Sequence, residues 1–149
     1  DMNTQHTIKT IAIVILSVII FASCEKETII DSNSLPKTAQ EFITTHFAGQ
    51  SIVSVVSDKE LLESSFEVSL SEGYNLNFNR KGECTKIDGN EKRVPDSAVS
   101  QKITEYVEKN YSPSFITNWE KETVGQSVEL SNDIELRFND KGEFTRIDN

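Results

Sequence analysis

Two stretches of the chain, residues 66–78 and 128–138, alternate hydrophobic and polar residues with a period of two. In the first, Val68 and Leu70 point to one side of the predicted strand while Glu67 and Ser69 point to the other. Residues 52–57 and 116–121 are predicted to add a further strand ahead of each stretch. The alternation is typical of an antiparallel sheet with one buried face and one face in water.

A helix is predicted ahead of each set of strands, because hydrophobic residues recur there at helical spacing. The first helix ends near Gly49, and the second is expected to begin with Asp96 as its N-cap and to end before Pro113. Such a stripe must be covered by another surface. The two stripes consist of Ala39, Phe42, Ile43, His46 and Phe47 in the first helix and of Val99, Ile103, Tyr106 and Val107 in the second.

One segment occurs twice with small changes, as FNRKGECTKID at residues 78–88 and as FNDKGEFTRID at residues 138–148. In each copy, the sequence Asn-x-Lys-Gly predicts a type I turn followed by a left-handed glycine in a short hairpin. Further matches in the same order, such as Leu35-Pro36 with Val94-Pro95, indicate a duplication.

The expected fold class is therefore α+β, with two tandem repeats at residues 35–90 and 91–149. Each repeat is predicted to be one helix followed by a four-stranded antiparallel sheet. Both helices are expected to pack on one sheet face, with the two sheets edge to edge or nearly so.

The N-terminal region has a different character. Lys9 precedes an uncharged run of eleven residues, Ile11 to Phe21, and a membrane-spanning helix needs about 20. A basic start, a short hydrophobic run and small residues indicate an export signal, and Cys24 after Phe-Ala-Ser resembles a bacterial lipobox. We expect residues 1–23 to be removed as a lipoprotein signal peptide, Cys24 to be lipidated and 24–34 to form a tether. An ordinary secretion signal and a short membrane anchor are the alternatives.

The formal net charge of −9 and the sequence pI near 4.7 exclude some partners. Nucleic acid is not expected, because phosphate binding needs clustered lysine and arginine, and electrostatic docking on anionic lipid is not expected either. With Cys24 lipidated, Cys84 is left alone, so no internal disulfide is predicted. Cys84 occupies the position that Phe144 has in the second copy of the repeated segment. This position indicates that Cys84 is a strand side chain rather than a reactive thiol.

Residues for catalysis are scarce. The sequence has two histidines, of which His6 lies in the predicted signal and His46 beside a helical stripe. No nucleophile motif, zinc-ligand spacing or phosphate-binding glycine loop accompanies them. The segment NDKGE contains oxygen ligands but lacks the layout of a calcium loop, so we interpret it as a hairpin turn. The sequence predicts no enzyme, no catalytic or metal-binding residue and no cofactor.

The chain resembles the PepSY-like family of small exported proteins of Bacteroidota, which are similar in fold to beta-lactamase inhibitor proteins. The resemblance covers roughly residues 35–149 and rests on framework residues. Many family members have a tryptophan after the Gly-Glu pair, where Cys84 and Phe144 stand here. The matching segments include Leu35-Pro36, Leu76-Asn77-Phe78-Asn79, Lys81-Gly82-Glu83 and Ile87-Asp88, and then Val94-Pro95, Tyr106, Tyr111, Lys141-Gly142-Glu143 and Ile147-Asp148.

The resemblance implies an exported, non-catalytic module that binds or inhibits another protein in the bacterial cell envelope, facing the periplasm or at the cell surface. Glycan or small-ligand binding and a purely structural role are the alternatives. An ordinary solvated face is the simplest explanation of the polar side of the sheet. If that side is instead the partner surface, its candidate residues are Glu67, Ser69, Asn75, Asn77, Trp119, Glu129, Glu135 and Arg137.

Overall fold

The computed structural model describes residues 28–59 and 64–148. The predicted signal peptide and Cys24 lie outside the described residues. Segments 28–34, expected as part of a tether, form the strand β1 (Thr28–Ile29) and the 3-10 turn η1 (Ser32–Ser34). The remaining elements are α2 (Lys37–His46), β2 (Ile52–Lys59), β3 (Ser64–Leu70), β4 (Asn75–Asn79), β5 (Cys84–Asp88), η2 (Asp96–Ala98), α3 (Gln101–Tyr111), β6 (Ile116–Lys121), β7 (Gln126–Leu130), β8 (Glu135–Phe138) and β9 (Phe144–Asp148).

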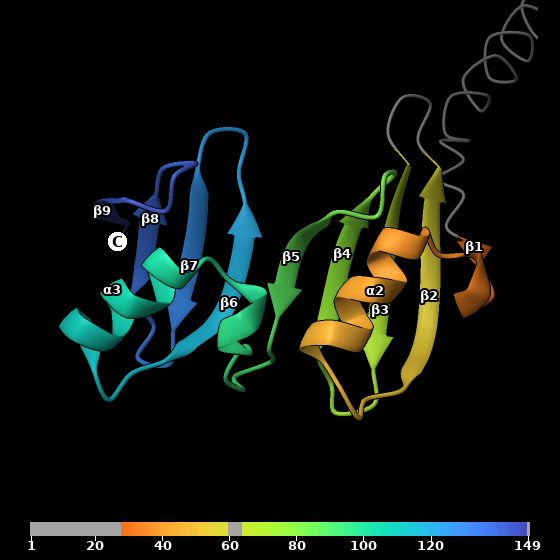
Figure 1. Cartoon of the computed structure of the whole chain (residues 1–149), viewed down its shortest axis with the longest axis horizontal. Helices are drawn as coiled ribbons and strands as arrows, with labels where there is room; N and C mark the ends of the chain where they lie inside the picture. Colours follow the sequence, from red (N-terminus) through yellow and green to blue (C-terminus); the bar gives the residue numbers. More distant parts are fainter. Residues whose placement is uncertain (1–27, 60–63, 149) are drawn as a thin grey trace, which may run out of the picture.

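The strands form one antiparallel sheet of nine strands in the order β1 to β9, each beside its neighbours in the chain (Figure 1). The predicted fold class, two tandem repeats each with its own four-stranded sheet, is therefore wrong. The sheet continues because β5 pairs with β6 through Lys86 with Glu120, Ile87 with Trp119 and Asp88 with Asn118. An isolated sheet would leave the backbone groups of β5 unpaired at an edge, and the pairing with β6 satisfies them.

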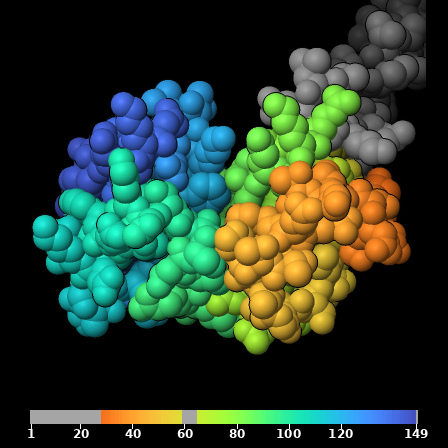
Figure 2. Space-filling view, in the orientation of Figure 1, coloured from red at the N-terminus to blue at the C-terminus, as the bar shows by residue number. Residues whose placement is uncertain are grey.

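Both α-helices lie on the same side of the sheet, α2 over the first strands and α3 over the last (Figures 1 and 2). Their apolar stripes pack on the inward side chains of the strands, as the contact of Phe42 with Phe78 and that of Tyr106 with Phe138 show, with ring centroids 5.8 and 5.5 Å apart. The buried core includes Ala39, Ile43, Ile103 and Val107 from the helices and Val68, Leu76, Ile87, Val128 and Leu136 from the strands. Hydrophobic burial therefore lies on one side of the sheet.

The second helix begins later than its sequence predicts. Asp96 lies in η2, where its carboxylate is 3.6 Å from Arg93, and α3 starts only at Gln101 with Ser100 as its N-cap. Val99 between them has an extended backbone. The extended backbone at Val99 separates η2 from α3, and the side chain of Val99 is buried in the core.

The repeated segment, residues 78–88 and 138–148, forms the predicted hairpin turns. Asn79 Oδ1 accepts hydrogen bonds from the backbone N–H groups of Lys81 and Glu83, and its amide donates to Glu83 Oε2 at 2.7 Å. Asn139 makes the same three bonds to Lys141 and Glu143. In each copy, therefore, one asparagine side chain stabilises the turn by accepting hydrogen bonds from two backbone N–H groups.

The turn glycine also touches the start of a helix. Gly82 has φ +81°, and a Cβ there would lie 2.7 Å from Pro36 Cβ and 2.9 Å from Ala39 N. Gly142, at φ +75°, lies against Ser100 and Lys102 in the same way. The hairpin therefore positions the first turn of each helix on the sheet.

Gly82→Ala is expected to lower the free energy of unfolding by about 2–4 kcal/mol, because it adds left-handed strain to overlap with α2. Gly49→Ala is the matched control, since Gly49 has φ +88° but nothing within 4 Å of the added Cβ. The free energy of unfolding of Gly49→Ala should fall by only about 1 kcal/mol. Urea denaturation of both variants measures the difference, and equal losses would contradict the packing role of Gly82.

A candidate binding surface on the helix-free face of the sheet

The side of the sheet opposite the helices, here called the helix-free face, carries two rows of side chains. Residues paired across antiparallel strands share a face, so the register defines each row. The first, called the oxygen row, contains Ser54, Ser69, Asn75, Asp88, Asn118, Glu129, Glu135 and Asp148. The second, called the mixed row, contains Glu67, Asn77, Lys86, Glu120, Ser127, Arg137 and Arg146.

Seven of the eight residues proposed from sequence as the partner surface lie on this face, in these two rows. They come from both ends of the sheet, and the β5–β6 pairing places them on one surface. The seven are Glu67, Ser69, Asn75, Asn77, Glu129, Glu135 and Arg137.

Trp119 is the exception, because it lies in line with Ile87 and Val128 on the helix side of the sheet. Simple alternation from the buried Ile116 would place Trp119 on the helix-free face. A bulge between Ile116 and Asn118 adds one residue and reverses the alternation from there on. Thr117, the extra residue, is buried and its hydroxyl donates to the backbone oxygen of Glu129 at 3.2 Å.

The polar side chains of β3 and β4 bond mainly with one another. Ser69 Oγ donates to Asn75 Oδ1 at 2.9 Å, and the amide of Asn77 donates to Glu67 Oε1 at 3.4 Å. This part of the face is therefore largely neutral, with hydroxyl and amide groups that are already paired.

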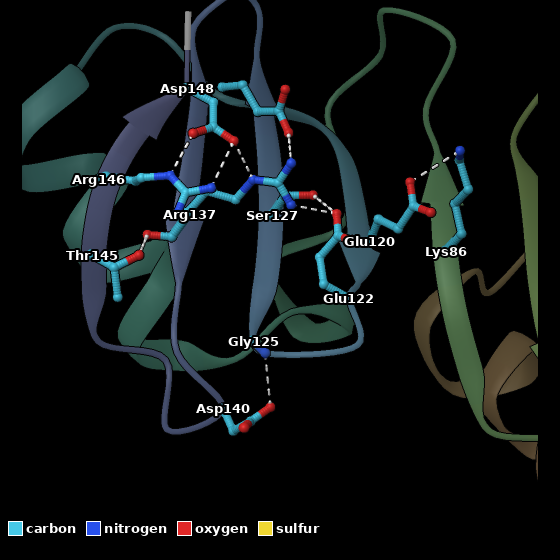
Figure 3. A network of polar contacts seen from close by, with 11 residues as sticks. Lys86, Glu120, Glu122, Gly125, Ser127, Arg137, Asp140, Thr145, Arg146 and Asp148 are labelled. Carbon is cyan, nitrogen blue, oxygen red and sulfur yellow. Dashed lines mark hydrogen bonds and ion pairs between the residues drawn. The ribbon is translucent and has the colours of Figure 1, made fainter.

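The β7–β9 part of the face is highly charged and centres on Arg137 (Figure 3). The Arg137 guanidinium lies 2.5 Å from Glu122, 3.1 Å from Glu135 and 2.6 Å from Asp148. Arg146 approaches the other oxygen of Asp148 at 2.6 Å. Hydrogen bonds from Arg146 and Arg137 lower the pKa of Asp148 from its ordinary value of 3.8 to about 2, and the bond to Asp148 raises the pKa of Arg137.

A concave pocket of about 470 Å³ lies on this charged part of the face. Its lining contains one ammonium, that of Lys86, which pairs with Glu120 at 3.1 Å. Asp88, Glu129 and Asp133 also line it, and none of the three forms an ion pair with another described residue. The pocket therefore combines a fixed charge network with carboxylates that can accept a cationic group.

The arrangement does not resemble a metal centre. Within residues 28–59 and 64–148, no group of three or more His, Cys, Asp or Glu side chains is placed to hold a metal ion. Glu129 instead accepts a hydrogen bond from the amide of Asn118. Sequence reasoning missed Asp88, Glu122, Arg146 and Asp148, whose proximity depends on pairing between strands.

A second cavity, of about 360 Å³, lies near Trp119 on the helix side. The indole N–H of Trp119 donates to Gln126 Oε1 at 2.9 Å, and Cys84, Lys121 and Asp140 complete the lining. Burial raises the pKa of the Cys84 thiol from its ordinary value of 9.0 to about 12. His46 is outside both cavities, with its Nδ1 3.0 Å from Ser97 Oγ, and burial lowers its pKa.

Residues 64–146 match the family described as "Putative beta-lactamase-inhibitor-like, PepSY-like". The chain belongs to this PepSY-like family, as the resemblance of its framework residues implied. None of the curated proteins matches the chain.

Three solved structures from Bacteroides species have the same fold, each with a TM-score of 0.78. One, from Bacteroides vulgatus, is described as a "putative periplasmic protein of unknown function"; it is 31% identical over 83% of this chain and 100% of its own. One from Bacteroides thetaiotaomicron, described as a "putative calcium-regulated periplasmic protein", is 29% identical over 83% of this chain and 97% of its own. A second structure from Bacteroides vulgatus, described as a "putative periplasmic protein", is 30% identical over 85% of this chain and 99% of its own.

These likenesses support a location in the periplasm or envelope. In the part of the chain that the structure describes, no helix has the length and hydrophobicity to cross a membrane.

Asp148→Asn is expected to destabilise the protein only where the carboxylate is ionised. Because folding lowers the pKa of Asp148, its stabilisation is complete above about pH 4 and is lost as the pH falls through about 2. The difference in unfolding free energy between wild type and variant should therefore be constant above pH 4 and shrink toward pH 2. Urea denaturation across this range tests it, and a difference that stays constant down to pH 2 would contradict the role of the Asp148 carboxylate.

Cys84 is expected to react slowly with iodoacetamide at pH 8. A rise in pKa from 9.0 to about 12 lowers the thiolate fraction about a thousandfold, and the thiolate is the reactive species. Mass spectrometry of folded and urea-unfolded protein measures the two alkylation rates. Similar rates in both states would show that the thiol is accessible and ionisable in the fold.

Proposed function

We propose that this protein is a lipid-anchored, non-catalytic module of the cell envelope that binds, and thereby inhibits, another protein through the helix-free face of its sheet. The observation that carries the proposal is the charged pocket on that face. It is concave, its walls are supplied by paired strands, and three of its carboxylates have no ion-pair partner among the described residues.

A protein loop with lysine or arginine side chains fits this pocket best. Asp88, Glu129 and Asp133 can each accept a cation. Arg137 holds two further lining carboxylates, those of Glu135 and Asp148, in place before binding. Preorganised groups lose little entropy when a partner arrives. Complementary charge also speeds encounter and selects against acidic partners.

The inhibitory part of the proposal draws on the family description, beta-lactamase-inhibitor-like. A shared fold is a weak warrant for a shared target, so the proposal names no target enzyme. Calcium regulation, which describes the relative from Bacteroides thetaiotaomicron, is not proposed here, because the described carboxylates are not grouped as metal ligands.

Glycan binding is the second candidate, and the cavity beside Trp119 favours it. An indole ring next to the polar side chains of Lys121, Gln126 and Asp140 is a combination that suits a sugar. Trp119 lines both this cavity and the charged pocket, whereas Lys121, Gln126 and Asp140 line only the cavity, so substitutions at these three residues separate the two candidates.

The test is a crosslinking pull-down from native membranes with the full-length protein. Asp88→Lys with Glu129→Lys reverses two charges in the pocket, and Glu105→Lys with Glu108→Lys makes the same change on the exposed side of α3. We expect wild type and the α3 variant to capture one protein that the pocket variant loses. The purified partner should then bind wild type more weakly as salt rises, because the contact is electrostatic.

Capture that is equal in all three proteins would contradict the role of the pocket. Loss of the captured protein on adding soluble glycans, together with its loss in Gln126→Ala, would favour glycan binding instead. Circular dichroism of each variant distinguishes lost binding from lost folding.

A further inference from the structure

The N-terminal edge of the sheet is formed by the short strand β1. β1 pairs with the outer side of β2, with Thr28 opposite Ser57 and Ile29 opposite Val56. The backbone N–H of Ile30 then donates to Val55 at 2.9 Å. The chain that leads back to Cys24 therefore leaves the fold from this edge, here called the β1–β2 edge.

The segment after β1 is fixed to the fold rather than extended from it. Asp31 caps η1 through the backbone N–H of Asn33 at 2.8 Å, and the side chain of Gln40 donates to the backbone oxygen of Leu35 at 2.9 Å. Leu35 itself is buried in the core. Residues 28–34 of the predicted tether are therefore held against the fold.

This leaves little distance between Cys24 and the sheet. Four peptide steps separate Cys24 from Thr28, and a fully extended chain spans at most about 3.6 Å per residue, or about 14 Å here. A bilayer that holds acyl chains on Cys24 must then lie close to the β1–β2 edge.

Two of the four large hydrophobic side chains that are exposed in the described residues occur at this edge, and the other two, Val124 and Ile147, lie in the second half of the chain. Ile29 is 78% exposed and Val53, at the bulge near the start of β2, is 67% exposed.

We propose that the β1–β2 edge is the membrane-facing edge of the protein, with Ile29 in contact with the lipid surface that holds Cys24. This inference rests on the proposed lipidation of Cys24. The sheet then stands away from the bilayer, and at about 4.8 Å per strand β9 lies about 40 Å from β1 along the sheet. The charged pocket is held in the membrane-distal half, where a soluble partner can reach it.

The experiment uses full-length protein that has been processed in cells and reconstituted in phosphatidylcholine vesicles containing nitroxide-labelled lipid. A nitrobenzoxadiazole fluorophore is attached at Ile29→Cys or, as the matched control, at Ile147→Cys on the opposite edge strand, both with Cys84→Ala. We expect the label at position 29 to be quenched severalfold more strongly than the label at position 147.

A second pair of proteins carries a Gly-Ser spacer of about 20 residues after Glu27, which spans about 25 Å on average. The spacer should bring the quenching ratio of the two labels toward one, and an unchanged ratio would contradict the argument from tether length. Equal quenching without the spacer would overturn the proposed orientation.

Mass spectrometry of the N-terminal peptide separates this inference from the proposal on which it rests. If Cys24 carries acyl chains and the two labels are quenched equally, only the orientation fails. If Cys24 carries none, both the orientation and the lipid anchor fail, while the pull-down still tests binding by the helix-free face.

Discussion

The pairing of β5 with β6 is the contact on which the rest of the structure depends. Three residue pairs join the strands beneath α2 to those beneath α3, and Gly89 makes the exit from β5 feasible. A Cβ at Gly89 would overlap the backbone oxygens of Lys92 and Thr117, and its own N–H donates to Thr117 at 2.8 Å. Without this junction the oxygen row would end at Asp88, and the charged pocket would lose one of its walls.

A continuous sheet with helices on one side creates an electrostatic problem on the other. Glu129 and Glu135 lie directly opposite each other, and Asp148 is the next residue in the row. Like charges at paired positions are destabilising. Arg137, which follows Glu135 by two residues in β8, offsets this repulsion because its guanidinium contacts the carboxylates of Glu122, Glu135 and Asp148. The side-chain amide of Asn118 donates a hydrogen bond to Glu129. Because Arg137 is only about a quarter exposed, solvent screens these contacts less than at an open surface.

Local patterns in the sequence predicted most of the elements but not their assembly. The strands, the Asn-x-Lys-Gly turns and seven residues of the helix-free face follow from alternation and turn chemistry, which depend on near neighbours. The position of Trp119 depends on a bulge that no periodicity contains, and the single sheet depends on a pairing between β5 and β6. The Arg137 network joins β8, β9 and the turn after β6, so no spacing in the chain indicates it. That the halves arose by duplication stays a prediction.

The two ends of the helix-free face differ in the pairing of their polar side chains. Serine and asparagine of β3 and β4 bond with each other, whereas Asp88, Glu129 and Asp133, which have no ion-pair partner among the described residues, line the pocket toward the other end. If Cys24 is anchored as proposed, the short chain between Cys24 and Thr28 holds the β1–β2 edge near lipid, and the order of the strands places the pocket at the far end of the sheet. The direction then follows from the tether and the strand order rather than from charge, because the acidic residues Asp31, Asp58 and Glu67 lie near the β1–β2 edge as well.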